Sequence, residues 1–312
     1  MQVLPTPPPV DRGRAFAEAG VATASWLPVA RSRAIRRGRV VGVEAPGGRV
    51  ALWRDGVGEV HGLGARCPHL GADLGQGRVE GDALVCPFHG WAFGGDGTCL
   101  GAPGWDEPPA RRARSVSVQE RWGLVWLATG PDPVALPELP PGRWRIVRPP
   151  AQTIRAHPHL VIGNGLDVAH FDTLHGLDPL AEPVLTVEPP RVSVEIRGRA
   201  RSRALRRLLG GDVAVRFTTH GGHVATADVF SPVRFRALFT ATPVAEGSRT
   251  QVVLFLPRGP RSTVRAAVGL YALLHDDARV LEGLRFRRAF TPADGPLAAF
   301  AEVVDGLPRG RA

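Results

Sequence analysis

The chain has 312 residues, 44% of them hydrophobic, and a formal net charge of +10. That is enough apolar material for two cores of ordinary domain size. All of its basic residues are arginine, which indicates a compositional bias rather than a nucleic-acid surface, and no apolar run reaches the roughly eighteen residues needed to span a bilayer.

The sequence begins with a proline-rich stretch that includes Pro7, Pro8 and Pro9. We expect residues 1–21 to form a flexible N-terminal tail, because such a segment has little to pack. Three cysteines in a chain of this length argue against a secreted disulfide framework, and no charged, apolar leader is present. These features predict a cytoplasmic protein.

Residues 22–130 alternate short β-prone runs with Gly and Asp turns. Residues 39–44, 50–53 and 123–127 are examples of such runs. This pattern predicts an all-β domain.

Two cysteine–histidine pairs lie in the predicted loops of this domain, Cys67-Pro-His69 and Cys86-Pro-Phe-His89. Two thiolates and two imidazoles form the ligand set of a Rieske [2Fe–2S] cluster, in which one iron takes the sulfurs and the other takes the nitrogens. A structural zinc site is the alternative. We consider it less favoured because zinc sites usually pair like with like, whereas each pair here is mixed.

The third cysteine, Cys99, has no partner once these four ligands are used, so we expect a small buried apolar residue. A proline-rich connector at 130–142 then marks a boundary. A second domain is predicted over 131–312. Its residues 191–196 and 250–256 have the pattern of strands in an antiparallel sheet.

Residues 165–175 read as a helical segment that contains His170 and His175. Five residues apart on a helix, or on a helix slightly unwound between them, two imidazoles can face one cavity. A single carboxylate from elsewhere would complete a 2-His-1-carboxylate site for non-haem Fe(II).

A second helical segment is predicted over 263–288, where apolar residues recur at helical intervals. They are Val264, Val268, Tyr271, Leu274, Ala278, Leu281 and Leu284. The same segment contains His275, Asp276, Asp277 and Glu282. We expect His275 to be an exposed or capping histidine, as we do for His157, His159, His220 and His223.

The motifs CPHLGADL and CPFHGWAF resemble the Rieske domain of ring-hydroxylating oxygenases. The segment beginning at Asn164 resembles the N-x-x-D-x-x-H-x4-H iron motif of their catalytic subunits, and Asp167, His170 and His175 match its later positions. In that family the third ligand is an Asp followed five residues later by Glu, which implies Asp277 as the ligand. Residues 86–99 and 119–126 are most similar to the 3-ketosteroid 9α-hydroxylase and cholesterol 7-desaturase branch.

This resemblance implies an α+β protein, with an N-terminal all-β Rieske domain and a C-terminal helix-grip (START-like) domain built on an antiparallel sheet. It implies that Asp167 links an iron histidine to a cluster histidine of a neighbouring subunit, within a homotrimer. The family often has Glu before its Asn, where this chain has Gly163.

The resemblance further implies a Rieske oxygenase component that uses O2 to oxidise, most simply hydroxylate, an apolar, ring-containing substrate. Its electrons would come from NAD(P)H through a separate reductase, with or without a ferredoxin, because no G-x-G-x-x-G fingerprint accompanies a βαβ pattern here. A Rieske ferredoxin-like electron carrier is the alternative function. Monooxygenation, dihydroxylation, desaturation and cyclisation share the same metals, and the sequence does not separate them.

Overall fold

The structure is a computed structural model that describes residues 14–18, 20–139, 141–259 and 261–310. Residues 1–13 of the predicted tail, and the side chain of Tyr271, lie outside this description. No helix within it is long and apolar enough to cross a membrane.

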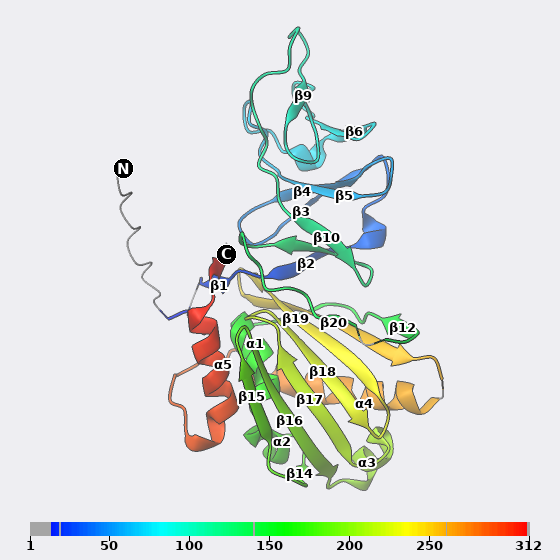
Figure 1. Cartoon of the computed structure of the whole chain (residues 1–312), viewed down its shortest axis with the longest axis vertical. Coiled ribbons are helices and arrows are strands. Elements are labelled where there is room, and N and C mark those ends of the chain that lie inside the picture. Colours follow the sequence, from blue (N-terminus) through cyan, green and yellow to red (C-terminus); the bar gives the residue numbers. More distant parts are fainter. Residues whose placement is uncertain (1–13, 19, 140, 260, 311–312) are drawn as a thin grey trace, which may run out of the picture.

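Three small antiparallel sheets form the N-terminal part of the chain, with strand orders β10-β11-β2, β3-β4-β5 and β6-β7-β8-β9. Figure 1 shows β6 and β9 at one extreme of the molecule, with β2 and β10 nearer the large sheet. The elements are β2 (Trp26–Arg31), η1 (Ser32–Ala34), β3 (Val40–Val43), β4 (Val50–Arg54), β5 (Val60–Gly64), η2 (Leu74–Gln76), β6 (Arg78–Glu80), β7 (Ala83–Val85), β8 (Ala92–Phe93), β9 (Cys99–Gly101), β10 (Val118–Arg121) and β11 (Leu124–Ala128).

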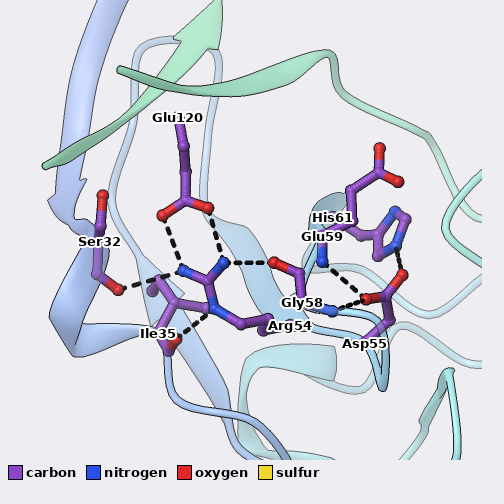
Figure 2. Close-up of polar contacts among 8 residues, drawn as sticks. All are labelled: Ser32, Ile35, Arg54, Asp55, Gly58, Glu59, His61 and Glu120. Atoms are coloured by element: carbon purple, nitrogen blue, oxygen red, sulfur yellow. Dashed lines mark hydrogen bonds and ion pairs between the residues drawn. The ribbon is translucent and has the colours of Figure 1, made fainter. Parts of the chain in front are cut away.

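Arg54 connects several segments in the middle of this domain through hydrogen bonds (Figure 2). Its guanidinium donates to both carboxylate oxygens of Glu120, at 2.6 and 2.8 Å, and to the carbonyls of Ile35 and Gly58. The next residue, Asp55, accepts two backbone N–H groups with one oxygen and lies 2.8 Å from His61 Nε2 with the other. These bonds hold the β4–β5 turn against η1 and β10. They stabilise the part of the domain that supports the loops around β6 and β9.

A nine-stranded antiparallel sheet forms the second part, in the order β12-β20-β19-β18-β17-β16-β14, with β13 beside β20 and β15 beside β16. Its strands are β12 (Trp144–Val147), β13 (Gln152–Ile154), β14 (Leu177–Pro179), β15 (Val184–Glu188), β16 (Arg191–Ala200), β17 (Val213–Thr219), β18 (Val224–Ser231), β19 (Phe235–Val244) and β20 (Gly247–Pro257). The helices are α1 (Pro158–Gly163), η3 (Asn164–Leu166), α2 (Ala169–Thr173), α3 (Arg203–Leu209), α4 (Arg261–Leu281), η4 (Pro292–Asp294) and α5 (Gly295–Gly306). The predicted α+β class with antiparallel sheets is confirmed.

Helix α4 lies across the sheet (Figure 1), and Ala267 and Leu270 pack against strand residues such as Val215 and Leu254. The helix ends at Leu281 rather than continuing to 288. The predicted apolar stripe is partly wrong, since Val264 and Val268 are exposed. Apolar residues occur on more than one side of this helix, so their spacing alone could not identify the packed side.

The end of the predicted tail is packed where the structure describes it. Ala15 and Phe16 are buried, and the Phe16 ring contacts Phe286 and Phe300 at centroid distances of 5.3 and 5.7 Å. Strand β1 (Ala22–Thr23) then pairs with β21 (Arg309–Gly310), which brings the two ends of the described chain together. A flexible tail is therefore wrong for Ala15 and Phe16, because the aromatic side chain of Phe16 fills a hydrophobic core. The domain boundaries at 22–130 and 131–312 stay a prediction.

Candidate functional site: two metal-ligand clusters and an apolar cavity

The two cysteine–histidine pairs lie in loops that have the same pattern of backbone hydrogen bonds. In each loop the cysteine carbonyl accepts a hydrogen bond from the glycine four residues later, Gly71 at 2.9 Å and Gly90 at 3.2 Å. Both glycines have positive φ, +81° and +70°, which allows each loop to turn back on itself. The cysteine N–H groups donate to Ala72 and Trp91. Two similar turns therefore present their side chains to a shared space.

The four side chains meet at that space. Cys67 and Cys86 are buried, and the rings of His69 and His89 lie 4.6 Å apart by centroid. Trp91 stacks on His69 at 4.6 Å and fixes the orientation of its ring. Cys99 is buried in the hydrophobic core behind them, as predicted, and its Sγ lies 3.6 Å from the carbonyl of Gly101.

The chemistry of this donor set fits an iron–sulfur cluster. Burial raises the pKa of the Cys67 thiol to about 11, so a bound cation is needed to hold it as a thiolate at neutral pH. The buried Nδ1 of His69 has no hydrogen-bond partner among the described residues. A bond from this nitrogen to an iron would account for the missing partner.

The second donor set comes from two helical elements. His170 lies on α2, His175 follows two residues after that helix, and Asp277 lies on α4. His175 Nε2 is 2.8 Å and His170 Nε2 is 3.5 Å from the same oxygen, Asp277 Oδ1. One ligand atom from each residue falls within 4.8 Å of the others. The structure thus brings together the three residues named as ligands from the sequence.

These three side chains fit a metal ion better than a hydrogen-bonded cluster. Both ring nitrogens of His170 and Nδ1 of His175 are buried without a hydrogen-bond partner in the described part of the chain. Two imidazoles and one carboxylate that converge in this way match the donor set of a non-haem Fe(II) site. His275 is exposed and stays outside the set, and Glu282 pairs instead with Arg155.

Asp167 lies at the break between η3 and α2, where its extended backbone (ψ 92°) interrupts the predicted helix. Its Oδ2 is 3.6 Å from His170 Nδ1, and this neighbouring ring lowers the pKa of the carboxyl. Its other oxygen, Oδ1, is buried and without a partner among the described residues. Asp167 therefore lies beside His170, one of the predicted iron ligands.

Gly163, where the family resemblance led us to expect Glu, lies in a tightly packed place. A Cβ at this residue would lie 2.8 Å from Leu297 Cδ1 and 3.1 Å from Phe300 Cδ1. Helix α5 approaches α1 so closely that a larger side chain has no room.

A cavity of about 610 Å³ adjoins His170, His175 and Asp277. One face of the large sheet lines it with side chains that alternate along the strands: Ile196, Val213, Val215, Phe217, Val229, Phe235, Phe239 and Val252. Leu270 and Leu274 of α4 close the other side. Sequence reasoning did not identify this lining, although the period-two alternation in 213–217 and 235–239 is a usable signal.

A third group with suitable donor atoms, Asp55, Glu59 and His61, lies near the base of the N-terminal domain. Figure 2 shows that both oxygens of Asp55 are already occupied, one by backbone N–H groups and the other by His61. These residues stabilise a turn.

The two ligand clusters lie far apart in one chain. Figure 1 places the loops around β6 and β9 at one extreme of the molecule and α2 with β14 at the opposite extreme.

Comparison with known proteins agrees with this geometry. Residues 25–120 match the Rieske [2Fe-2S] domain. The chain is 34% identical over 191 residues to a 4beta-methylsterol monooxygenase of Methylococcus capsulatus, covering 57% of this chain and 52% of the relative. It is 34% identical over 165 residues to a 3-ketosteroid-9-alpha-monooxygenase oxygenase component of Rhodococcus rhodochrous, covering 48% and 42%. The predicted resemblance to that branch is confirmed.

The crystal structure of dicamba monooxygenase bound to dicamba superposes with a TM-score of 0.72 at 21% identity, over 91% of this chain and 97% of that one. The fold is thereby shown over nearly the whole chain. The chain spans about half the length, or less, of the curated relatives it matches.

Proposed function

We propose, for a chain that carries a Rieske [2Fe–2S] domain on a Rieske oxygenase fold, that it is the catalytic component of an oxygenase. It would use O2, and electrons from NAD(P)H delivered by a separate reductase, to oxidise an apolar, ring-containing substrate. The carrying observation is the convergence of His170, His175 and Asp277 beside a large apolar cavity. A pure electron carrier, the alternative considered from the sequence, has no use for either feature.

The residues assigned to each group follow from the geometry. Cys67, Cys86, His69 and His89 would hold the cluster, and His170, His175 and Asp277 would hold the mononuclear iron. When bound, the cluster supplies electrons singly and the iron supplies open coordination positions for O2. The chain itself supplies an apolar cavity between the sheet and α4, which would limit the access of water to the bound substrate.

The cavity lining supports an apolar substrate. Val, Ile and Phe side chains cover the sheet face, and the hydroxyls of the lining residues Thr219, Ser231 and Thr250 lie within hydrogen-bond distance of backbone carbonyls. The apolar side chains of the sheet face would therefore supply most of the binding through buried apolar area. The relatives named for sterol and ketosteroid oxidation support ring-containing substrates of this kind.

Transfer of electrons between the two centres requires a neighbouring subunit in this proposal. The ligand clusters lie at opposite extremes of one chain (Figure 1), whereas the partly exposed Asp167 carboxylate beside His170 would accept from a cluster imidazole of another copy. A head-to-tail ring satisfies both conditions, and the family resemblance favours three subunits. We also propose a reductase, with or without a ferredoxin, as the electron donor, since one relative is named an oxygenase component.

Metal analysis with EPR tests the assignment. We expect about three irons per chain, a Rieske signal after dithionite reduction, and loss of about one iron with an intact Rieske signal in His170→Ala. Substrate-dependent O2 consumption with a generic reductase, across a panel of neutral ring compounds, would then identify the reaction. Zinc in place of the paired irons, or full iron content in the variant, would overturn the proposal.

A further inference from the structure

Helix α2 is weakly held by its own structure. It has five residues, Ala169–Thr173, with no buried residue and no side-chain hydrogen bond at its N-cap. A helix of little more than one turn is unstable by itself. The free-energy cost of nucleating it is larger than the stabilisation from its one or two hydrogen bonds. Contacts from outside must therefore fix the segment that carries His170 and leads into His175.

We propose that Arg201 is a positioning residue for the mononuclear metal site, acting as a clamp on segment 170–178. Its guanidinium donates to the Asp172 carboxylate on α2 and, at 2.5 Å, to Asp178 Oδ1 on β14. It also approaches the Asp172 carbonyl, and its backbone N–H donates to the Gly176 carbonyl at 2.9 Å. One residue thus holds the chain on both sides of His175.

The clamp acts on the metal site through the backbone. Asp172 is half-exposed and lies between the two histidines in sequence, whereas His175 is buried and faces Asp277. The contact of Asp172 with Arg201 fixes the backbone of α2. The imidazoles of His170 and His175 therefore keep their spacing when no metal is present. Without the Arg201 guanidinium, the carboxylates of Asp172 and Asp178 would lie near each other with no positive charge between them.

The strand that leads into Arg201 also offers a matched control. Arg199 lies two residues earlier, is equally exposed, and forms a two-bond pair with Asp212 at 2.7 and 2.8 Å. Its guanidinium therefore binds the segment before β17 rather than the carboxylates of α2 and β14. Exposed ion pairs contribute little to global stability, so the two arginines should differ in their effect on metal binding and not on unfolding.

The test is Co(II) binding to the full chain, with the Rieske cluster loaded and the mononuclear site emptied by chelation. This inference rests on the proposed function, so the first measurement is the wild type, whose visible Co(II) bands should disappear in His175→Ala. We then expect Arg201→Gln to weaken Co(II) binding about tenfold and to alter its band pattern, in the range seen when outer partners of metal ligands are removed. Arg199→Gln should match the wild type.

Two further variants keep the test decisive if Arg201→Gln is poorly folded. Asp172→Asn removes one arm of the clamp and should weaken Co(II) binding by a smaller factor. Arg201→Lys should restore only part of the affinity, because an ammonium cannot form the forked contact to two carboxylates.

The outcomes separate the two proposals. Wild-type protein without a His175-dependent Co(II) spectrum would overturn the proposed function and this inference with it. A wild-type spectrum together with unchanged Co(II) affinity in both Arg201→Gln and Asp172→Asn would overturn the clamp alone. Equal weakening in Arg199→Gln would also overturn it, because the effect would then reflect surface charge.

Discussion

Asp167 is the single residue on which the proposed electron route depends. Its carboxylate lies beside His170 but outside the set of ligand atoms that converge on Asp277. We expect Asp167→Ala to keep both metals and to slow turnover by about 10–100-fold, because the carboxylate proposed to link the two imidazoles is lost. Stopped-flow reoxidation of the reduced Rieske centre, with substrate and O2 present, measures this step directly. Reoxidation at the wild-type rate would show that the carboxylate is not on the route.

Gly163 provides a packing test at the same scale. Gly163→Glu would push a side chain into Leu297 and Phe300, at positions where even Cβ is 2.8 to 3.1 Å from them. Overpacking of this kind costs about 1–3 kcal/mol. Urea denaturation should show this loss as a lower midpoint. The control is Gly306→Glu, which should unfold near the wild-type midpoint because a Cβ added there would meet no atom within 4 Å.

The sequence predicted donor residues that the structure brings together, because metal chemistry restricts donor types and their spacing. It could not by itself choose Asp277 over Asp276, and the family resemblance made that choice. The exclusion of a side chain at Gly163 depends on α5, which is more than 130 residues away in the chain. Contacts of that kind are not encoded in any local pattern.

At the scale of elements, neutral histidines hold the N-terminal segment. His159 Nδ1 accepts from the Ala17 N–H, and His223 Nε2 accepts from the Thr23 N–H while its Nδ1 bonds the Ala241 carbonyl. His157 bonds the Glu18 carbonyl. The charged groups nearby are Arg309, beside His159, and Asp305, which accepts from the Ala15 and Phe16 N–H groups and pairs with Arg288.

These histidines predict a specific loss of stability in mild acid. Burial lowers the pKa of His223 to about 4 and that of His159 well below its ordinary value. Below about pH 6.5 these histidines bind protons in the unfolded chain but stay neutral in the folded chain. The free energy of unfolding is therefore highest above about pH 6.5 and falls as the pH drops towards 4. For His223 alone the loss is about 2–3 kcal/mol across this window.

Urea midpoints between pH 7 and pH 4.5 test this prediction. His223→Asn should be less stable at pH 7 and should show a shallower decline with acid, because one of the buried titrating groups is gone. The exposed His275→Asn should leave the decline unchanged. A decline as steep in His223→Asn as in the wild type would contradict the assignment.

The sheet was easier to predict than the helices. Strands such as β16 and β20 include the predicted runs 191–196 and 250–256, since period-two alternation follows directly from one buried face. The predicted helix over 165–175 is instead η3, a break at Asp167, and α2. The break points the Asp167 carboxylate at His170. Arg201 contacts Asp172 of α2 from 29 residues away, and a contact at that separation is not encoded in the local pattern.

At the scale of the whole molecule, the distal end of the N-terminal domain exposes large apolar side chains. Leu70 and Phe88, which adjoin the predicted cluster ligands His69 and His89, are 67% and 63% exposed, and Leu100 and Trp105 are 54% and 62% exposed. Solvent-exposed groups of this size around a redox centre indicate a surface that is covered in an assembly. In the proposed ring this surface would lie on the next subunit, near its Asp167.

A charge placed on that surface should therefore break the ring. We expect the double variant Leu100→Arg/Trp105→Arg to shift the sedimentation velocity profile from a trimer towards a monomer at micromolar concentration, because two cations would be buried without partners. Neither residue is a proposed ligand, so the Rieske EPR signal should persist, while intersubunit electron transfer and turnover fall together. Val57→Arg, at an equally apolar and 83% exposed site on the β4–β5 turn, is the matched control and should sediment as the wild type does. A variant that stays trimeric at every concentration would place the contact elsewhere, and a wild type that is monomeric yet fully active would contradict the ring.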